Sequence, residues 1–336
     1  MKVLIIGGTR FVGYLLAWRL LVRGDEVTLL NRGNLPDPFG DRVQRLRVDR
    51  TTPDFVRALD GQRFDATVDF AAYDPRDVRT VIDSLGDRVG HYVFISTGQV
   101  YLVRQEVPRP AKETDFDGPL MPEPNDPAEH HEWEYGMKKR GCEEALVAAS
   151  QSGFKATRIR IPMVNGERDY LRRIESYLWR MVDGGPILLP DGGREIARHV
   201  YGVDVAIALA TLLGDERTYG KAYNLCQDEA PTVFDLLGML IDLVGSPDNR
   251  VPVPRELFGE LPDRQISPFS QARWMSLLDP GLARHELGFH HRPLGVYLNA
   301  IVASFFAHPP ASPPENYVRY RAAERELAKK VPGYGD

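Results

Sequence analysis

Cysteine is scarce in this sequence of 336 residues, which contains only Cys142 and Cys226. Two cysteines are too few for a disulfide framework, and such scarcity is typical of proteins that fold in a reducing compartment. The longest apolar runs are far shorter than the ~20 residues that a membrane-spanning helix needs. The sequence also shows no signal peptide before its first predicted strand. We therefore expect a cytoplasmic protein without a membrane anchor.

Basic charge is not in excess either, because the formal net charge is -5 at pH 7. Proteins that bind nucleic acid usually present a basic surface, so this balance argues against generic DNA or RNA binding. The paired His130 and His131 lack the spaced cysteine, histidine or carboxylate partners of a metal site. We predict that they are loop histidines and that no metal is bound.

A glycine-rich turn near the N-terminus gives the first chemical signal. A short apolar run, Val3 to Ile6, predicts a buried strand, and an amphipathic segment from Phe11 to Arg23 predicts a helix. Glycine lets the backbone approach a pyrophosphate, and the helix dipole favours negative charge at the turn. The turn alone is a weak signal, because any tight strand-to-helix connection can use glycine. The cofactor-binding residues predicted here are Gly7, Thr9, Arg10, Phe11, Val12 and Gly13.

The second predicted strand and its exit loop, Glu26 to Gly33, bear on the choice of cofactor. An acid at the end of this strand would bind the ribose 2′-hydroxyl of NAD, whereas basic residues would bind the 2′-phosphate of NADP. Asn31 and Arg32 stand here instead of an acid, and Arg10 adds a second guanidinium. We predict that NADP is preferred, with NAD as the alternative. The competing explanation is that both arginines are solvated surface residues.

Strand and helix patterns alternate along the first half of the chain. Further strands are predicted at Val43 to Asp49, Phe64 to Tyr73, His91 to Tyr101 and Lys155 to Pro162. The alternation predicts an α/β fold, with a Rossmann-type doubly wound parallel sheet and a smaller, mostly helical C-terminal substrate-binding domain. We expect the NAD(P)-binding domain at residues 1–160 and about 194–226. The substrate-binding domain should then comprise about 161–193 and 227–336.

A proline-rich, charged stretch from Val103 to Glu132 interrupts this alternation. A loop of this length directly after a strand is expected to cover the ligand crevice. The next segment, Trp133 to Ser150, predicts a helix that carries Tyr135 and Lys139 one turn apart on one face. From spacing alone, an ordinary surface helix would be the simpler explanation.

Six ordered motifs give the first 230 residues or so a resemblance to a known family. They are GGTRFVG (Gly7 to Gly13), VDR (Val48 to Arg50), DFAAY (Asp69 to Tyr73), ISTGQVY (Ile95 to Tyr101), YGMKK (Tyr135 to Lys139) and RIPMVNG (Arg160 to Gly166). Because it has these motifs in this order, the sequence resembles the extended short-chain dehydrogenases/reductases. This is the NAD-dependent epimerase/dehydratase group, which includes nucleotide-sugar epimerases and dehydratases. The resemblance implies an NAD(P)-dependent oxidoreductase or epimerase that acts on a secondary alcohol or ketone, with sugar nucleotides among the candidate substrates.

The resemblance also assigns roles to individual residues. Tyr135 corresponds to the family's catalytic acid/base, Lys139 to its partner, and Thr97 to the hydroxyl that binds the reacting oxygen. A phenol with a pKa of ~10 is a weak base at neutral pH, and a nearby ammonium together with a cationic nicotinamide favours the phenolate. The further cofactor-binding residues that the resemblance implies are Asp49 and Arg50 at the adenine, Ala71, Ala72 and Tyr73 along the cofactor, and Pro162, Met163 and Val164 near the nicotinamide amide. The implied substrate-binding residues are Gln99, Arg194 and Arg198, and surface-loop arginines are the alternative for the last two.

The sequence departs from the family pattern at two motifs. Arg10 replaces the middle glycine of the usual turn, a variant shared with chloroplast stem-loop RNA-binding proteins. A non-catalytic Rossmann-fold protein that binds RNA or a nucleotide is therefore the alternative. Gly98 and Gln99 replace the Asp-Glu pair of sugar-nucleotide 4,6-dehydratases. We expect no dehydration or decarboxylation, unless a loop acid such as Glu113 or Asp115 reaches the site.

The family resemblance also implies a homodimer. Two helices with apolar stripes, Pro75 to Leu85 and Trp133 to Ser150, would pack against their symmetry mates as a four-helix bundle. The substrate, the direction of the reaction and the choice between reductase and epimerase stay open at this point.

Overall fold

The computed structural model describes residues 1–334, which form two compact units. The first unit contains Met1–Pro162, Gly202–Cys226 and Leu278–His291. The second contains Met163–Tyr201, Gln227–Leu277 and the described residues from Arg292 onward. Each unit is described by itself below.

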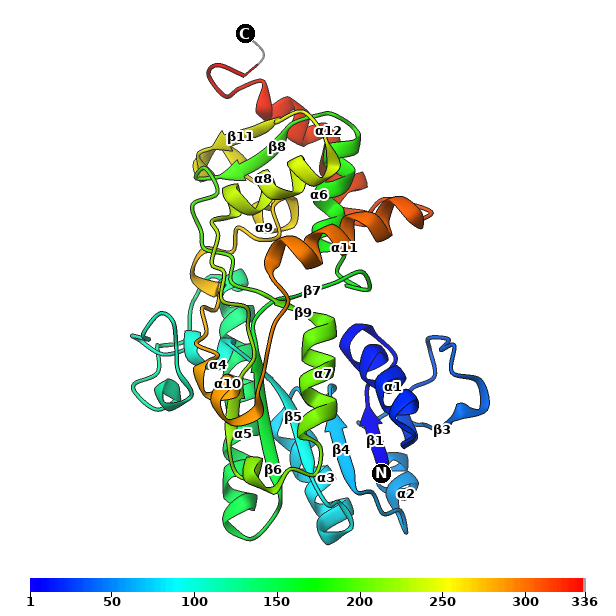
Figure 1. The fold of residues 1–336 in the computed structure, drawn as a ribbon. Helices are drawn as coiled ribbons and strands as arrows, with labels where there is room; N and C mark the ends of the chain where they lie inside the picture. The colour runs from blue at the N-terminus through cyan, green and yellow to red at the C-terminus, as the bar shows by residue number, and fades with distance from the viewer. Residues whose placement is uncertain (335–336) are drawn as a thin grey trace. The chain divides into compact units, whose positions relative to one another are not determined.

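A parallel sheet of seven strands forms the centre of the first unit, in the order β10-β6-β5-β4-β1-β2-β3 (Figure 1). The strands are β1 (Lys2–Ile6), β2 (Glu26–Asn31), β3 (Val43–Arg47), β4 (Ala66–Asp69), β5 (Tyr92–Thr97), β6 (Ala156–Ile161) and β10 (Ala222–Asn224). The chain order reverses at β1, which pairs with both β2 and β4. Ligands of such sheets bind outside the carboxyl ends of the strands at this switch point. The predicted Rossmann-type fold is confirmed.

Helices cover both faces of this sheet (Figure 1). On one face α1 (Phe11–Arg23) packs against α7 (Gly202–Leu212), and on the other α3 (Pro75–Leu85) packs against α5 (Pro127–Gln151). Because side chains alternate along a strand, Leu4 and Ile6 of β1 both lie in the core that α3 and α5 close. The shorter helices of this unit are α2 (Asp54–Leu59), α4 (Gln99–Leu102) and α10 (Gly281–Leu287).

Helix α5 begins six residues before the predicted start, so the stretch that was expected to be a covering loop ends in helix. The Asp126 side chain caps this helix by accepting the N–H groups of Ala128 and Glu129 at 3.0 and 2.9 Å. Pro127 occupies the first helical position, where a missing N–H costs nothing. Similarly, β5 ends at Thr97, and α4 follows where the sequence predicted a continuing strand.

The unit boundaries differ from the predicted domain boundaries by more than two residues at two places. Residues 194–201 belong to the second unit, where Val200 pairs with Val164. Residues 278–291 return to the first unit, where the Asp279 N–H donates to the Ala111 carbonyl oxygen at 2.8 Å. This return depends on a contact between segments far apart in the sequence.

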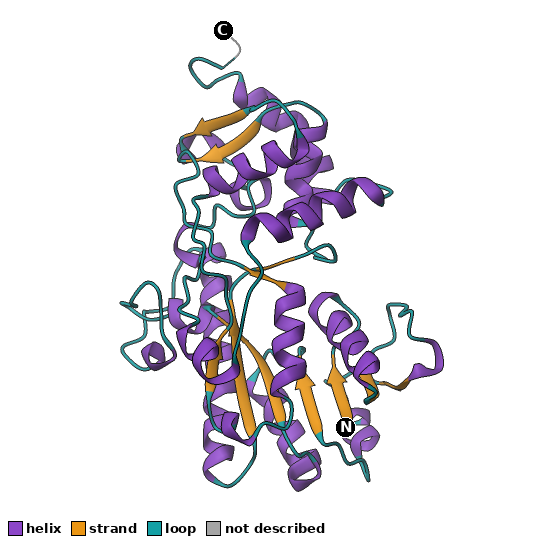
Figure 2. Ribbon diagram, in the orientation of Figure 1, coloured by secondary structure: helices purple, strands orange, loops and turns teal. Residues whose placement is uncertain are grey.

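The second unit is mostly helical (Figure 2). Its helices are α6 (Arg173–Val182), α8 (Val233–Val244), α9 (Asp263–Ile266), α11 (Leu294–Ala307) and α12 (Glu315–Ala328). Two short parallel pairs of strands complete it, β7 (Val164–Asn165) with β9 (Val200–Tyr201), and β8 (Ile187–Pro190) with β11 (Arg250–Val253). A buried ion pair between Arg180 and Glu324 joins α6 to α12. Within residues 1–334, no helix has the length and apolar character to cross a membrane.

Candidate active site

The turn between β1 and α1 is shaped for close approach of a ligand backbone. Gly7 has a φ of +83°, in the left-handed region that glycine adopts without strain. A Cβ added at Gly13 would lie 2.7 Å from the Cα of Gly8, so only glycine fits where the helix crosses the turn. The first turn of α1 carries no acidic side chain, and no side chain caps its N-terminus. These features fit the pyrophosphate of a dinucleotide, whose negative charge the helix N-terminus favours.

Basic side chains gather where β2 and β3 end. Arg32 is exposed directly after β2, and Arg47 on β3 lies opposite Asn31 in the strand pairing. The Asp49 carboxylate accepts hydrogen bonds from the Thr51 N–H at 2.9 Å and the Thr51 hydroxyl at 2.7 Å. These bonds, together with the charge of Arg32, lower the pKa of Asp49. Sequence reasoning missed Arg47, because its place beside Asn31 depends on the pairing of the two strands.

Arg50 forms an ion pair with the buried carboxylate of Asp69. Its guanidinium donates to both carboxylate oxygens of Asp69, at 2.9 and 3.1 Å. Asp69 also accepts the Tyr92 hydroxyl and the Ala71 N–H, each at 2.8 Å. Burial disfavours the charge on Arg50, but Asp69 outweighs it and raises the pKa of Arg50 above its usual value. The observed role of Arg50 is therefore to tie the end of β3 to β4, and its contact with an adenine stays a prediction.

Lys139 lies buried at the carboxyl ends of β4 and β5. Its Nζ donates to the carbonyl oxygens of Ala72 at 2.9 Å and Ile95 at 2.8 Å. The same ammonium lies 4.8 Å from the ring centre of Tyr73 and 4.7 Å from that of Phe94, distances that allow cation–π attraction. Burial lowers the pKa of Lys139 to about 8. At neutral pH the side chain therefore remains mostly charged, and its carbonyl partners hold that charge at one point.

Tyr135 and Thr97 belong to the same part of the first unit. The rings of Tyr135 and Tyr73 have centres 6.4 Å apart, so Tyr73 connects Tyr135 with the Lys139 ammonium. Thr97 is the last residue of β5, and its hydroxyl accepts the Gln99 N–H at 3.3 Å. A Cβ added at Gly136 would lie 2.9 Å from the carbonyl oxygen of Gln99, so this glycine lets α5 pack tightly against α4.

Glu132 is a carboxylate at this site that sequence reasoning missed. The Gln99 side-chain amide donates a hydrogen bond to it. Glu132 lies three residues before Tyr135 on α5, hence on the same side of the helix. That spacing was visible in the sequence, but the sequence predicted that the helix would begin only at Trp133.

Glu113 and Asp115, the two loop acids named above as alternatives, both accept hydrogen bonds from the protein backbone. Glu113 accepts the backbone N–H of Asn224 at 2.7 Å, and burial raises the pKa of its carboxyl. Asp115 accepts the N–H of Lys112 at 2.8 Å at the start of a short 3-10 helix. Both carboxylates therefore accept hydrogen bonds from backbone N–H groups of the first unit.

Four of the predicted residues, Met163, Val164, Arg194 and Arg198, belong to the second unit. The Met163 carbonyl accepts the Val200 N–H at 3.1 Å, and Val164 pairs with Val200 in the short sheet. Arg198 donates to the carbonyl oxygen of Asp228 at 2.9 Å, whereas Arg194 is exposed. Their predicted roles toward cofactor and substrate stay predictions.

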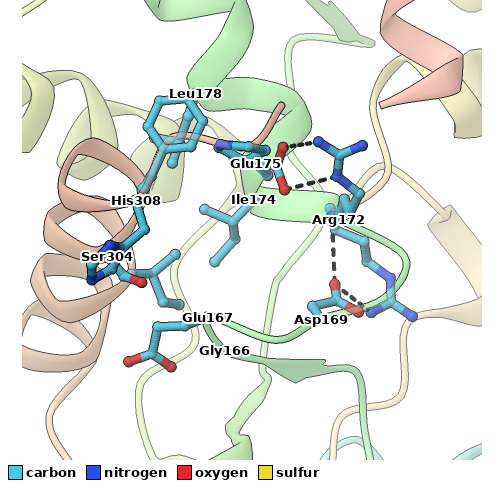
Figure 3. Close-up of a pocket in the computed structure, with 13 residues that line it drawn as sticks. Gly166, Glu167, Asp169, Arg172, Ile174, Glu175, Leu178, Ser304 and His308 are labelled. Atoms are coloured by element: carbon cyan, nitrogen blue, oxygen red, sulfur yellow. Dashed lines mark hydrogen bonds and ion pairs between the residues drawn. The ribbon is translucent and has the colours of Figure 1, made fainter. Parts of the chain in front are cut away.

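A small pocket that is partly open to solvent lies within the second unit, between the start of α6 and the end of α11 (Figure 3). Arg172 pairs with Glu175, and Arg173 with Asp169. Glu167, also in its wall, accepts the Tyr201 hydroxyl at 2.6 Å. None of the predicted site residues lines this pocket, and both of its arginines are paired with acids of its own wall. Across residues 1–334, no group of three histidine, cysteine or acidic side chains is arranged to hold a metal.

A family model described as "NAD dependent epimerase/dehydratase family" matches residues 3–226, two thirds of the chain. The protein belongs to this family. The glycine turn and the basic residues after β2 fit the dinucleotide that the family name implies. A Cβ added at Gly7 would lie only 3.0 Å from the Cβ of Ala71, so the turn packs closely against the segment that follows β4.

Two similar proteins carry names that describe different functions, one a binding protein and the other a reductase. The chain is 25% identical over 305 residues to the chloroplast stem-loop binding protein of 41 kDa b from Arabidopsis thaliana, a match covering 86% of this chain and 74% of that protein. It is 26% identical over 288 residues to 2′-dehydrokanamycin reductase from Streptomyces kanamyceticus, covering 84% and 78%.

Solved structures of epimerases and dehydratases share the fold of this family member. The UDP-glucose 4-epimerase of Thermotoga maritima, in complex with UDP-glucose, matches with a TM-score of 0.73 at 20% identity, over 91% of this chain and 99% of that one. DesIV, a dTDP-glucose 4,6-dehydratase from Streptomyces venezuelae, matches with a TM-score of 0.70 at 22% identity, over 92% and 98%. At these identities the likeness establishes the fold alone.

Proposed function

We propose that this family member is an NAD(P)-dependent oxidoreductase or epimerase that transfers a hydride at a secondary alcohol or ketone. The observation that carries the proposal is the buried ammonium of Lys139, one helical turn from Tyr135. A charge fixed by two carbonyl groups favours the phenolate form of a neighbouring tyrosine. Burying an ammonium costs free energy even when it is hydrogen-bonded, which favours a functional role for this lysine.

The division of roles follows from the positions of these side chains. Tyr135 takes the hydroxyl proton of an alcohol, or returns a proton to the oxygen of a ketone. Thr97, at the end of β5, donates a hydrogen bond to the same oxygen. Lys139 remains protonated and holds the phenolate electrostatically. The nicotinamide of the bound cofactor supplies or accepts the hydride.

The basic residues after β2 support NADP as the preferred cofactor, with NAD as the alternative. Arg32 and Arg47 are both exposed near the end of this strand, where they can bind a 2′-phosphate. Arg10, in the turn before α1, is a further candidate. Asp49, an acid near this strand end, accepts hydrogen bonds from Thr51, and the charge of Arg32 acts on it.

For the substrate, we propose a sugar, with sugar nucleotides as the leading class. The Thermotoga maritima epimerase is described in complex with UDP-glucose, and the Streptomyces kanamyceticus relative is named for reduction of 2′-dehydrokanamycin. Gln99, whose N–H donates to the Thr97 hydroxyl, is proposed to bind a sugar hydroxyl. Arg194 and Arg198 are proposed to bind a diphosphate.

The alternative function is that of a binding protein without turnover. The 25% identity to the chloroplast stem-loop binding protein favours it. The presence of Thr97, Tyr135 and Lys139 together, and the net charge of -5, favour the enzyme. Incubation with NADP or NAD and a panel containing UDP-glucose and kanamycin, read by nicotinamide absorbance and by mass, tests the proposal. Binding of a labelled RNA stem-loop with no change in any sugar would support the alternative.

We also propose that the reaction ends at redox or inversion and expels no water. Gln99 replaces the glutamate of the dehydratases, and its neutral amide cannot shuttle a proton. Glu132 is the one carboxylate hydrogen-bonded to Gln99 among the described residues, whereas the dehydratase motif supplies two acids. A product lighter by water in the mass assay would contradict the proposal and would make Glu132 the first residue to replace.

A further inference from the structure

We propose that Glu132 is a substrate-contacting residue, which binds a hydroxyl or ammonium group that the substrate carries next to its reacting carbon. The inference rests on the proposed function, because it takes Tyr135 and Thr97 as the groups that meet the reacting oxygen. It adds a requirement to the substrate: a hydrogen-bond donor must face Glu132.

The position of Glu132 follows from two elements of the first unit. It lies three residues before Tyr135 on α5, so both side chains project from one side of that helix. Its partner Gln99 follows Thr97 by two residues at the start of α4. Close packing at Gly136 fixes α5 against α4. Glu132 is thus tied through Gln99 to Thr97 and through its own helix to Tyr135.

The hydrogen bond between the two side chains also determines which atoms a ligand meets. A carboxylate only accepts, so Gln99 must turn its Nε2 toward Glu132 and its Oε1 away from it. No described residue donates a hydrogen bond to Gln99 Oε1, and Gln99 as a residue is 9% exposed. The amide oxygen and the carboxylate therefore form a pair of acceptors beside the catalytic tyrosine.

Two acceptors, one of them charged, select the chemistry of the ligand. Hydroxyl and ammonium groups donate to such a pair, and an ammonium gains additional attraction from the carboxylate. A phosphate at the same place would be repelled by the carboxylate and would find no donor. The sugar ring or an amino-sugar ring, rather than a diphosphate, is the part of the substrate that Glu132 contacts.

Calorimetric titration of the protein–NADP complex with UDP-glucose and with kanamycin tests this contact. UDP-glucose offers only hydroxyl groups from its sugar, whereas kanamycin also offers ammonium groups. We expect Glu132→Gln to weaken binding of at least one probe by about 10- to 100-fold, the range for a hydrogen bond to a charged group. A loss confined to kanamycin identifies an ammonium as the donor, and an equal loss for both identifies a hydroxyl.

Glu134→Gln is the matched control, because Glu134 carries the same charge on the same helix but pairs with Lys138 at the surface. It should bind both probes as the wild type does. Gln99→Leu removes the neutral acceptor of the pair and the amide that orients the carboxylate. It should weaken binding in the same direction by a smaller factor, because the charged acceptor remains. Equal affinities of wild type and Glu132→Gln, or no binding of either probe to the wild type, would overturn the inference. Binding that depends on Glu132 without any turnover would instead contradict the proposed function.

Discussion

Replacing Lys139 with methionine should change how the stability of the protein depends on pH. The residue is 3% exposed, and burial lowers the pKa of its ammonium from 10.5 to about 8. The unfolded chain therefore binds this proton more tightly than the folded protein does. The resulting loss of stability is fully present below pH 8 and disappears as the pH rises through the unfolded value of 10.5.

The size of this effect follows from the shift itself. At 1.36 kcal/mol for each unit of pKa, the difference between 10.5 and about 8 corresponds to about 3 kcal/mol. Raising the pH from 7 to 9.5 should recover about 2 kcal/mol of it, because the folded state has then released its proton. Methionine has a similar length but no proton to lose, so the variant should lack this gain.

Urea unfolding of the cofactor-free protein at the two pH values measures the effect. Lys139→Met leaves the carbonyl oxygens of Ala72 and Ile95 without their donor, so its overall stability will be lower. The informative quantity is therefore the change in the free energy of unfolding between the two pH values, not its absolute size. The control is Lys138→Met, since Lys138 is an exposed neighbour paired with Glu134, and its variant should behave like the wild type. An identical pH dependence in wild type and Lys139→Met would refute the reasoning.

Three further predictions concern turnover, cofactor choice and assembly. Tyr135→Phe should lower turnover by about 10²- to 10⁴-fold and leave the cofactor Kd unchanged, and unchanged turnover on a wild-type substrate would assign the proton to another group. NADP should bind more tightly than NAD in calorimetry, and Arg32→Ala should weaken NADP selectively, whereas equal affinities in the wild type would contradict the preference. Light scattering should give a dimer mass, with α3 and α5 at the interface, and a monomer mass at micromolar concentration would count against this assembly.

Local patterns in the sequence determined much of the first unit. Glycines between an apolar run and an amphipathic segment predicted the turn from β1 to α1, because these signals depend on neighbours along the chain. The early start of α5 was also readable, since Asp126 and Pro127 form an ordinary N-terminal signal that the proline-rich composition obscured.

Other features were decided only when distant segments came together. Arg50 follows a strand, and its contact with the cofactor stays a prediction, but nothing in the sequence indicated that pairing of β1 with β4 would bring Asp69 to it as an ion-pair partner. Gln99 and Glu132 are separated by 33 positions and meet because α4 packs on α5 at Gly136. Burial of Lys139, and hence its lowered pKa, likewise comes from the ends of two strands that close around it. Hydrogen bonds and desolvation act through space, so a sequence pattern names the groups but the tertiary fold sets their partners and their charge.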